Sequence, residues 1–134
     1  MTTVSYGVFA QTEVLDLVTD ETSFNARVAA LPNGGFAIAY GHLIFQPTGN
    51  TADGTIDFKA FDGLGVALTD SITVNVVTNG FQSDAKIAVA PNGSIGIVFE
   101  SQTGGANPSH SVLVRWMDAN FSLVSVGESE VPLI

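Results

Sequence analysis

The chain has 134 residues, of which 46% are hydrophobic, and its 4 basic and 13 acidic residues give a net charge of −9. This length fits a single domain with a real core, and the acidic balance argues against nucleic acid and anionic membranes as partners. The chain has no cysteine, which excludes disulfides and thiolate metal sites. No apolar run is long enough to cross a bilayer, so we expect no membrane insertion.

The N-terminal segment predicts strands. Residues 1–10 carry neither a basic residue nor a signal-type apolar core, so we expect no cleavable signal peptide. Residues 3–9 alternate in polarity as a strand does, and residues 15–19 predict a second strand. Within the first of these, Val4 and Tyr6 are expected at an interface between chains.

The next segment predicts a β-hairpin. Residues 26–31 and 36–40 are apolar runs joined by a Pro-Asn-Gly turn, and Asn-Gly between such runs is a strong hairpin signal. The second run places Phe36, Ile38 and Tyr40 on one face and alanines on the other. We therefore expect this strand to be buried on both faces, and a charge introduced at Ile38 to prevent folding.

These elements recur along the chain. Residues 26–40 return about sixty residues later as 85–99, and a period of that size predicts a repeat architecture. We therefore expect a charge at Ile97, the equivalent of Ile38, to prevent folding as well. The remaining strands recur too: 3–9 matches 55–61 and 111–117, and 15–19 matches 74–78 and, more weakly, 131–134.

The predicted fold class is all-β, because no helical period is sustained. From the recurring strands we expect antiparallel four-stranded repeat units, with a β-sandwich as the alternative arrangement. The chain is expected to form a single β domain over 1–134, made of a partial repeat (3–13), repeat 1 (14–71) and repeat 2 (72–134).

All four basic residues fall at equivalent positions of the repeat. Arg27 aligns with Lys86, and Lys59 aligns with Arg115. One interpretation is that each is a surface charge paired with a nearby carboxylate; Asp84, Asp57 and Glu100 are the candidates. The other is that the pairs mark a ligand-binding position that occurs once per repeat.

Two longer loops, 42–54 and 101–110, occupy the same place in each repeat and should project from the same edge. Loops on a rigid scaffold are the usual place for binding. The candidate ligand-binding residues are the polar side chains of these loops together with the single tryptophan: His42, Gln46, Asn50, Asp53, Gln102, Asn107, His110 and Trp116. The two histidines are expected in separate, equivalent sites. Trp116 is expected to pack in the core or an interface, or to stack on a sugar.

The first loop also contains an apolar run, Leu43-Ile44-Phe45. Such a run in a loop is often a contact surface; the alternative is that it tucks under the loop or extends the preceding strand. The other expected interface residues lie near the two ends of the chain: Val4, Tyr6, Val131 and Leu133.

No catalytic motif is present. The phosphate loop, the nucleophile elbow, the zinc helix motif and the calcium loop are all missing, so we expect no enzyme, no catalytic residue, no metal site and no cofactor. The weaker alternative is calcium held by Asp53, Asp57 and Asp62.

The hairpin at 26–40 and the stretch 53–68, Asp-Gly-Thr-Ile-Asp-Phe-Lys-Ala-Phe-Asp-Gly-Leu-Gly-Val-Ala-Leu, resemble a repeat of large secreted RTX-type bacterial adhesins. The likeness spans 14–126. It is weaker in the second copy, where Asn107-Pro108-Ser109 replaces Asp-Gly and Asn120-Phe121 replaces the glycine turn. The resemblance implies four-stranded blades of β-propeller type and a role in binding or display.

About two and a half repeats cannot close a propeller, which typically needs four to eight blades. We therefore expect a homo-oligomer, with a trimer favoured, or docking onto a larger protein assembly. The expected function is that of a non-enzymatic, self-assembling β-repeat protein with a structural or display role on an extracellular or virion surface, such as a capsid decoration or spike subunit. The alternative is a lectin-like module that binds glycans at repeated loop sites.

Overall fold

The computed structural model describes residues 21–45, 52–76, 80–102, 109–124 and 129–130, and these residues contain strands and turns but no helix. The predicted all-β class is confirmed. The strands are β1 (Glu21–Ala30), β2 (Phe36–Phe45), β3 (Ala52–Phe61), β4 (Ile72–Thr73), β5 (Phe81–Val89), β6 (Ile95–Gln102), β7 (His110–Met117) and β8 (Ser129–Glu130).

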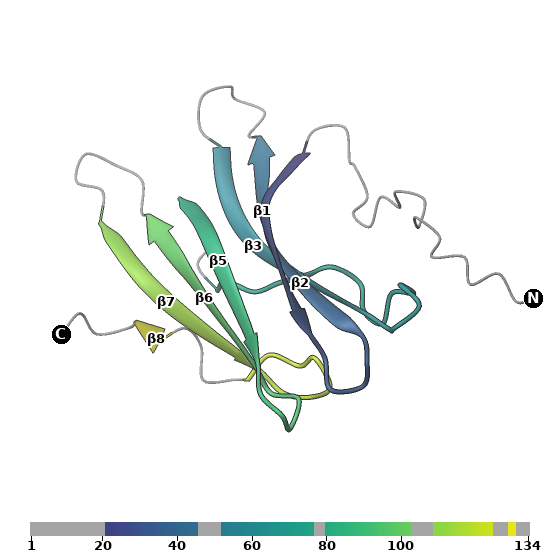
Figure 1. Cartoon of the computed structure of the whole chain (residues 1–134). Coiled ribbons are helices and arrows are strands. Elements are labelled where there is room, and N and C mark those ends of the chain that lie inside the picture. Colours follow the sequence, from purple (N-terminus) through teal and green to yellow (C-terminus); the bar gives the residue numbers. More distant parts are fainter. Residues whose placement is uncertain (1–20, 46–51, 77–79, 103–108, 125–128, 131–134) are drawn as a thin grey trace, which may run out of the picture.

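All of these strands belong to one open sheet in the order β1-β2-β3-β5-β6-β7-β8, with β4 paired to β3 off this path. Neighbouring strands are antiparallel except at one place, where Gly54 of β3 pairs with Phe81 of β5 in parallel. The sheet therefore consists of a first strand group, β1 to β4, and a second strand group, β5 to β8 (Figure 1).

The two predicted hairpins are confirmed, and their turns have the same geometry. The N–H of Gly34 donates to the carbonyl of Leu31 at 3.1 Å, and that of Gly93 donates to the carbonyl of Ala90 at 2.8 Å. Both glycines have positive φ, 89° and 88°, which the Asn-Gly pattern anticipates because glycine adopts this conformation at little cost.

The turns after β3 and β7 also share a geometry, although their sequences differ. The Oδ1 atom of Asp62 accepts hydrogen bonds from the backbone N–H groups two and four residues later, at 2.8 and 2.9 Å, and that of Asp118 does the same at 2.9 and 3.0 Å. Gly65 has φ 83°, and Phe121, in its place in the second turn, has φ 64°. The aspartate therefore holds the turn even where the glycine is lost.

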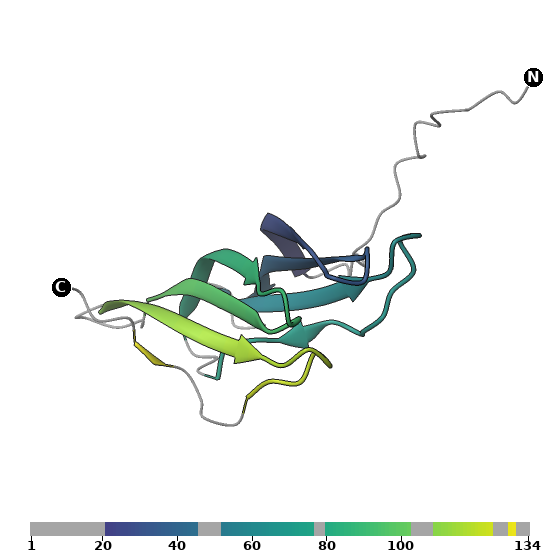
Figure 2. The same ribbon diagram turned by 60° about the horizontal axis from the view of Figure 1, so that its bottom comes forward.

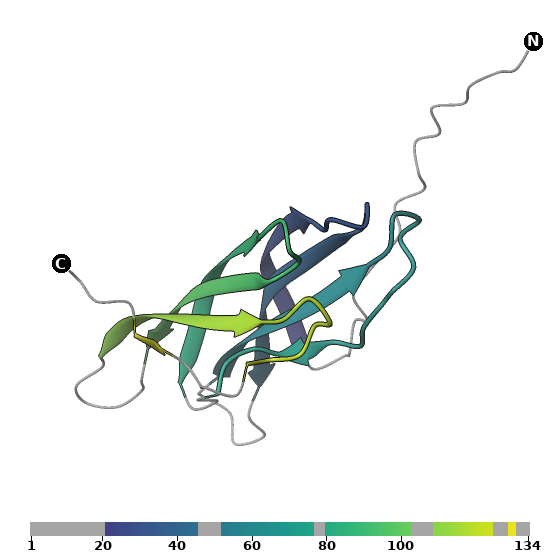
Figure 3. The same ribbon diagram turned by 90° about the horizontal axis from the view of Figure 1, so that it is seen from below.

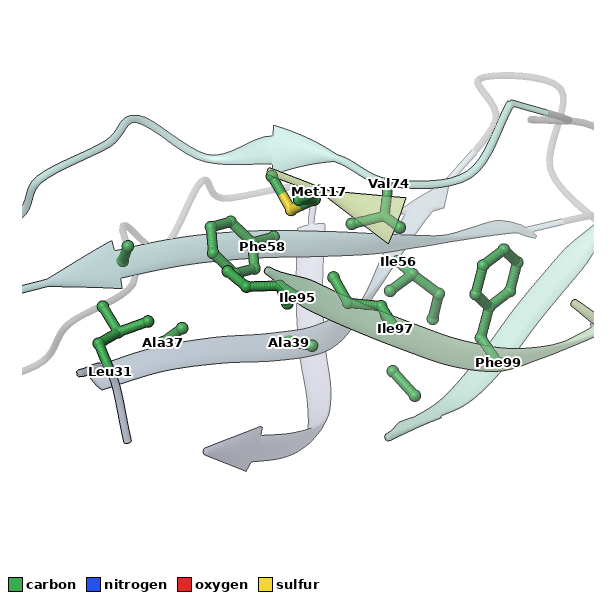
Figure 4. Close-up of a cluster of buried hydrophobic side chains, with 12 residues drawn as sticks. Leu31, Ala37, Ala39, Ile56, Phe58, Val74, Ile95, Ile97, Phe99 and Met117 are labelled. Atoms are coloured by element: carbon green, nitrogen blue, oxygen red, sulfur yellow. The ribbon is translucent and has the colours of Figure 1, made fainter. Parts of the chain in front are cut away.

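The core lies between the two strand groups. In the turned views the second group lies across one face of the first (Figures 2 and 3). Side chains from both groups meet there in one cluster (Figure 4). Its fully buried members are Ala37 and Ala39 of β2, Ile56, Phe58 and Ala60 of β3, Val74 after β4, Ala85 of β5, Ile95, Ile97 and Phe99 of β6, and Met117 of β7. Burial of this apolar surface is the main stabilising contribution to the fold.

The expectation that the strand at 36–40 is buried on both faces is wrong for two of its large residues. The alanine face of β2 is fully buried against the second group, but Phe36 and Ile38 on the opposite face are only half-buried. In β6 the reverse holds: Ile97 is fully buried and Val98 is half-buried. The two groups therefore pack with the small-residue face of β2 against the large-residue face of β6.

The packing predicts a large effect for the substitution Gly35→Ala. A Cβ atom at Gly35 would overlap sterically with the backbone carbonyl oxygen of Phe61, which cannot move without distorting β3. We expect the free energy of unfolding, measured in urea, to fall by about 1–3 kcal/mol. The matched control is Gly65→Asn, because a Cβ at Gly65 meets nothing within 4 Å and asparagine tolerates positive φ. Equal losses in the two variants would contradict the steric argument.

Candidate functional site

A polar network lies on the face of the first strand group that is turned away from the core. Antiparallel pairing places Tyr40 of β2 opposite Asp57 of β3. The Asp57 carboxylate contacts His42 Nδ1 at 2.9 Å and accepts a hydrogen bond from Ser71 Oγ at 3.4 Å, and Ser71 in turn contacts the Tyr40 hydroxyl at 2.5 Å. Thr55 Oγ1 donates to the other carboxylate oxygen at 3.5 Å. The carboxylate is thus held by three side chains.

The network contains a serine, a histidine and an aspartate, but their order differs from that of a hydrolytic triad. In a triad the serine bonds to the imidazole, which can then remove its proton. Here both Ser71 and His42 bond to the same carboxylate, and the hydrogen bonds of Ser71 go to Tyr40 and Asp57. The arrangement orients these groups and does not activate the hydroxyl as a nucleophile.

His42 was predicted from the sequence as a candidate residue, whereas Tyr40, Thr55 and Ser71 were not. Asp57 was predicted only as a charge partner or a calcium ligand. Strand alternation offered a usable signal, because Tyr40 and His42 share one face of β2. The missing information was the register that places this face next to Asp57.

A second polar network lies inside the core and joins the two strand groups. Asn75 Oδ1 accepts a hydrogen bond from the backbone N–H of Ile56 at 2.8 Å, and Asn75 Nδ2 donates to Gln82 Oε1 at 3.4 Å. Gln82 Nε2 donates to Ser101 Oγ at 3.3 Å. Gln82 is completely buried, so satisfied amide groups of this kind fix the alignment of the two groups.

The predicted ligand-binding residues that the structure describes lie in strands, not in loops. His42 belongs to β2, Asp53 to β3, Gln102 to β6, and both His110 and Trp116 to β7. Gln46, Asn50 and Asn107 lie outside the described residues. The two strands that precede the loops, β2 and β6, do end at the same edge of the sheet (Figure 1), as expected.

One expectation for these residues is wrong, and one of the alternatives for Trp116 is excluded. His42 and His110 are not at equivalent positions, because His42 lies within β2 opposite Thr55, whereas His110 begins β7 opposite Gln102. Trp116 is not a core residue: it is 53% exposed, and its ring lies over Gly96 on the face turned away from the core. Asp53 has a structural partner, since its Oδ1 accepts a hydrogen bond from the N–H of Gly80 at 3.2 Å.

The apolar run Leu43-Ile44-Phe45 extends β2 and is not part of a loop. Its pairing with β3 continues to the last residue, where Phe45 lies opposite Ala52. Ile44 is 38% exposed, so the strand carries an accessible apolar side chain near the sheet edge. The other interface candidates, Val4, Tyr6, Val131 and Leu133, lie outside the described residues.

The four basic residues have different surroundings despite their equivalent sequence positions. Arg27 and Lys86 are exposed. The Nζ atom of Lys59 lies 5.8 Å from the centre of the Phe61 ring. Arg115 is only 8% exposed, and its Nε and Nη1 atoms have no hydrogen-bond partner. Within the described residues none of the four forms an ion pair with a carboxylate, so the expected charge pairing is wrong.

A shallow pocket of about 190 Å³ lies where the two hairpin turns meet. It is lined by Leu31, Pro32, Asn33, Pro91, Asn92, Gly93, Ala119 and Phe121. The side-chain oxygens of both asparagines accept hydrogen bonds from the backbone within their own turns. The polar groups of this pocket therefore stabilise the turns.

Across the described ranges there is no group of three or more histidine or acidic side chains placed to hold a metal ion. The same residues include no helix that is long and apolar enough to cross a membrane. Comparison of the chain with protein-family models, with curated proteins and with solved structures found no match.

Proposed function

We propose that the protein is a non-enzymatic, self-assembling structural protein built from β-repeat units. This proposal rests on two faces of the sheet, one in each strand group, that lie on the side opposite the core. The first strand group leaves Val28 68% exposed, and the second leaves Trp116 53% exposed. Val28 lies opposite the half-buried Ile38, and Trp116 lies next to the half-buried pair Val98 and Val114. Adjacent apolar side chains of this kind form a patch that another protein can cover.

The chemistry of the polar network supports a structural function. Its carboxylate, hydroxyl and imidazole groups bond to one another in an order that holds the strands together. The buried side chains of Asn75 and Gln82 link the two strand groups, and Ser101 bonds to Gln82. Such groups rigidify a scaffold.

The resemblance to propeller-type repeats of secreted adhesins supports a more specific proposal. The repeat units act as blades, and copies of the chain associate into a closed ring, with a trimer as the favoured assembly. The ring serves as a display element on an extracellular or virion surface, for example as a capsid decoration or spike subunit. The acidic charge of −9 fits this location, because it disfavours adsorption to nucleic acid.

The mass in dilute solution tests self-assembly. One chain has a mass of 13.9 kDa. Light scattering and native mass spectrometry of the full chain should give a single species of three times that mass. We expect the species to dissociate on dilution, as mass action requires. A monomer at every concentration up to hundreds of micromolar would reject the proposal.

A lectin-like function is the second candidate, and the exposed Trp116 favours it. A flat aromatic ring that lies over a glycine, open to solvent, suits stacking on a sugar. A glycan array probed with the wild type and with Trp116→Ala tests this function. Binding that is lost in the variant would support it, and no binding to any glycan would reject it.

A further inference from the structure

We infer that copies of this chain associate head to tail, with the outer face of the first strand group of one copy packed on the outer face of the second strand group of the next. The inference rests on the proposed self-assembly and specifies its contact. The outer face of the first group includes Val28, Phe36, Ile38 and Lys59, with Phe61 buried beside Phe36. That of the second includes Gly96, Val98, Val112, Val114 and Trp116, together with two exposed charges, Lys86 opposite Val98 and Glu100 opposite Val112.

The residues of each outer face can be assigned from the pairing. Val28 and Lys59 both lie opposite Ile38, on β1 and β3, and paired residues share a face of the sheet. In the second group, Trp116 lies opposite Gly96 and Val114 lies opposite Val98. Each outer face is therefore a continuous surface over at least two strands.

The outer face of the first group is equivalent in sequence to a face that is already buried within the chain. Phe36 and Ile38 correspond to Ile95 and Ile97, which are both fully buried against the first group. Val28, 68% exposed, corresponds to Ile87, which packs against the core. The chain thus carries two versions of one apolar face, of which the second is the more completely covered.

The outer face of the second group is equivalent in sequence to the inner face of the first group, against which the second group packs. Gly96 and Val98 correspond to Ala37 and Ala39, which are completely buried beneath β6. Val112 and Val114 correspond to Ile56 and Phe58. A second copy placed on this face would continue the contact that the chain already makes between its own two groups.

Trp116 is the largest change between the equivalent surfaces, since it takes the place of Ala60. Inside the chain the Phe121 ring reaches the Phe58 ring, with their centres 5.9 Å apart. On the outer face of the first group the place of Phe121 is taken by Gly65, whose surroundings are empty within 4 Å. The contact between copies therefore lacks the bulky ring that the internal contact has at Phe121, which offsets the added volume of Trp116.

The polar network on the first group does not oppose such a contact. Its carboxylate, which belongs to Asp57, already accepts hydrogen bonds from neighbouring side chains, and the Asp57 side chain is 7% exposed. Burial by a partner would leave this carboxylate paired, and paired polar groups are buried at little cost.

Because each contact joins two different faces, the association is heterologous, which produces either a closed ring or an open filament. A contact between identical faces would stop at a dimer. The two geometries therefore predict different products of covalent cross-linking.

The natural absence of cysteine makes the cross-linking test direct. The full-length double variant Ile38→Cys/Val98→Cys is oxidised and run on a non-reducing gel beside each single variant. The two cysteines sit on opposite outer faces of one chain, so a disulfide between them must join two copies. We expect the double variant to give covalent species of two and three copies, and both single variants to remain monomeric on the gel. The control pair Ile38→Cys/Ser122→Cys, whose second cysteine lies in an exposed turn, should stay uncross-linked.

Tryptophan fluorescence of the wild-type chain gives an independent measure of the contact, because Trp116 is its only tryptophan. Burial of the ring in the contact should shift its fluorescence to shorter wavelength as concentration rises, in parallel with the increase in mass. Cross-linking of Ile38→Cys to itself would overturn the head-to-tail contact in favour of a symmetric one. An oligomeric wild type whose double variant does not cross-link would assign the faces to another occupant, whereas a monomeric wild type would reject the proposed self-assembly itself.

Discussion

The Ile97→Asp variant is expected to be unfolded at 25 °C. Ile97 is completely buried at the centre of the cluster that joins the two strand groups (Figure 4). The substitution removes about 1.5–3 kcal/mol of apolar burial and places a carboxylate where water cannot reach it, which costs several kcal/mol more. A total above about 4 kcal/mol is a large part of the 5–15 kcal/mol that stabilises a typical domain. Circular dichroism and the lack of a cooperative thermal transition would show the loss.

The matched control is Ile38→Asp, at the equivalent position of the first hairpin. Ile38 is half-buried and faces away from the core, so the carboxylate remains hydrated. We expect this variant to fold, with a loss of about 1 kcal/mol. Under the proposed head-to-tail contact it should also remain monomeric, because the charge lies in the middle of the outer face. Unfolding of both variants to the same extent would show that the two faces are equally buried.

This pair of variants shows where sequence patterning was sufficient and where it failed. Alternation and the Asn-Gly turns predicted the hairpins, because both signals are local. The same alternation predicted equal burial for Ile38 and Ile97, since the two hairpins have the same pattern of large and small side chains. Burial depends on which face another strand group covers, and that is a property of the packing of the whole sheet.

The candidate site shows the same division between local and non-local information. A histidine in a polar stretch was identified from the sequence, but its assignment to a loop was wrong because β2 continues through Leu43 to Phe45. The contact of His42 with Asp57 depends on the register between β2 and β3. Register is fixed by pairing along the whole strand, which short motifs do not encode.

The surroundings of Arg115 could not be predicted from its sequence equivalent. Lys59 occupies the same position in the first repeat and is partly solvated beside Phe61. Arg115 shares its face of β7 with Met117, which is 1% exposed, and so its guanidinium enters the core side of the second group. Two of its three nitrogen atoms are buried without a hydrogen-bond partner. A buried cation of this kind is costly, because water is lost and no acceptor replaces it.

Replacement of this arginine by a long apolar side chain should therefore stabilise the protein. Methionine fills much of the volume of the aliphatic stem and removes the unpaired donors. We expect Arg115→Met to raise the free energy of unfolding by about 1–4 kcal/mol. The measurement is urea denaturation at one fixed protein concentration, because the apparent stability of an associating protein depends on its concentration.

Lys59→Met is the matched control, because it makes the same kind of change at the equivalent position on the outer face. Lys59 is partly solvated, so its removal should change the free energy of unfolding by no more than about 0.5 kcal/mol. A gain confined to Arg115→Met would show that the unpaired guanidinium destabilises the fold. A loss of stability in Arg115→Met would contradict the prediction.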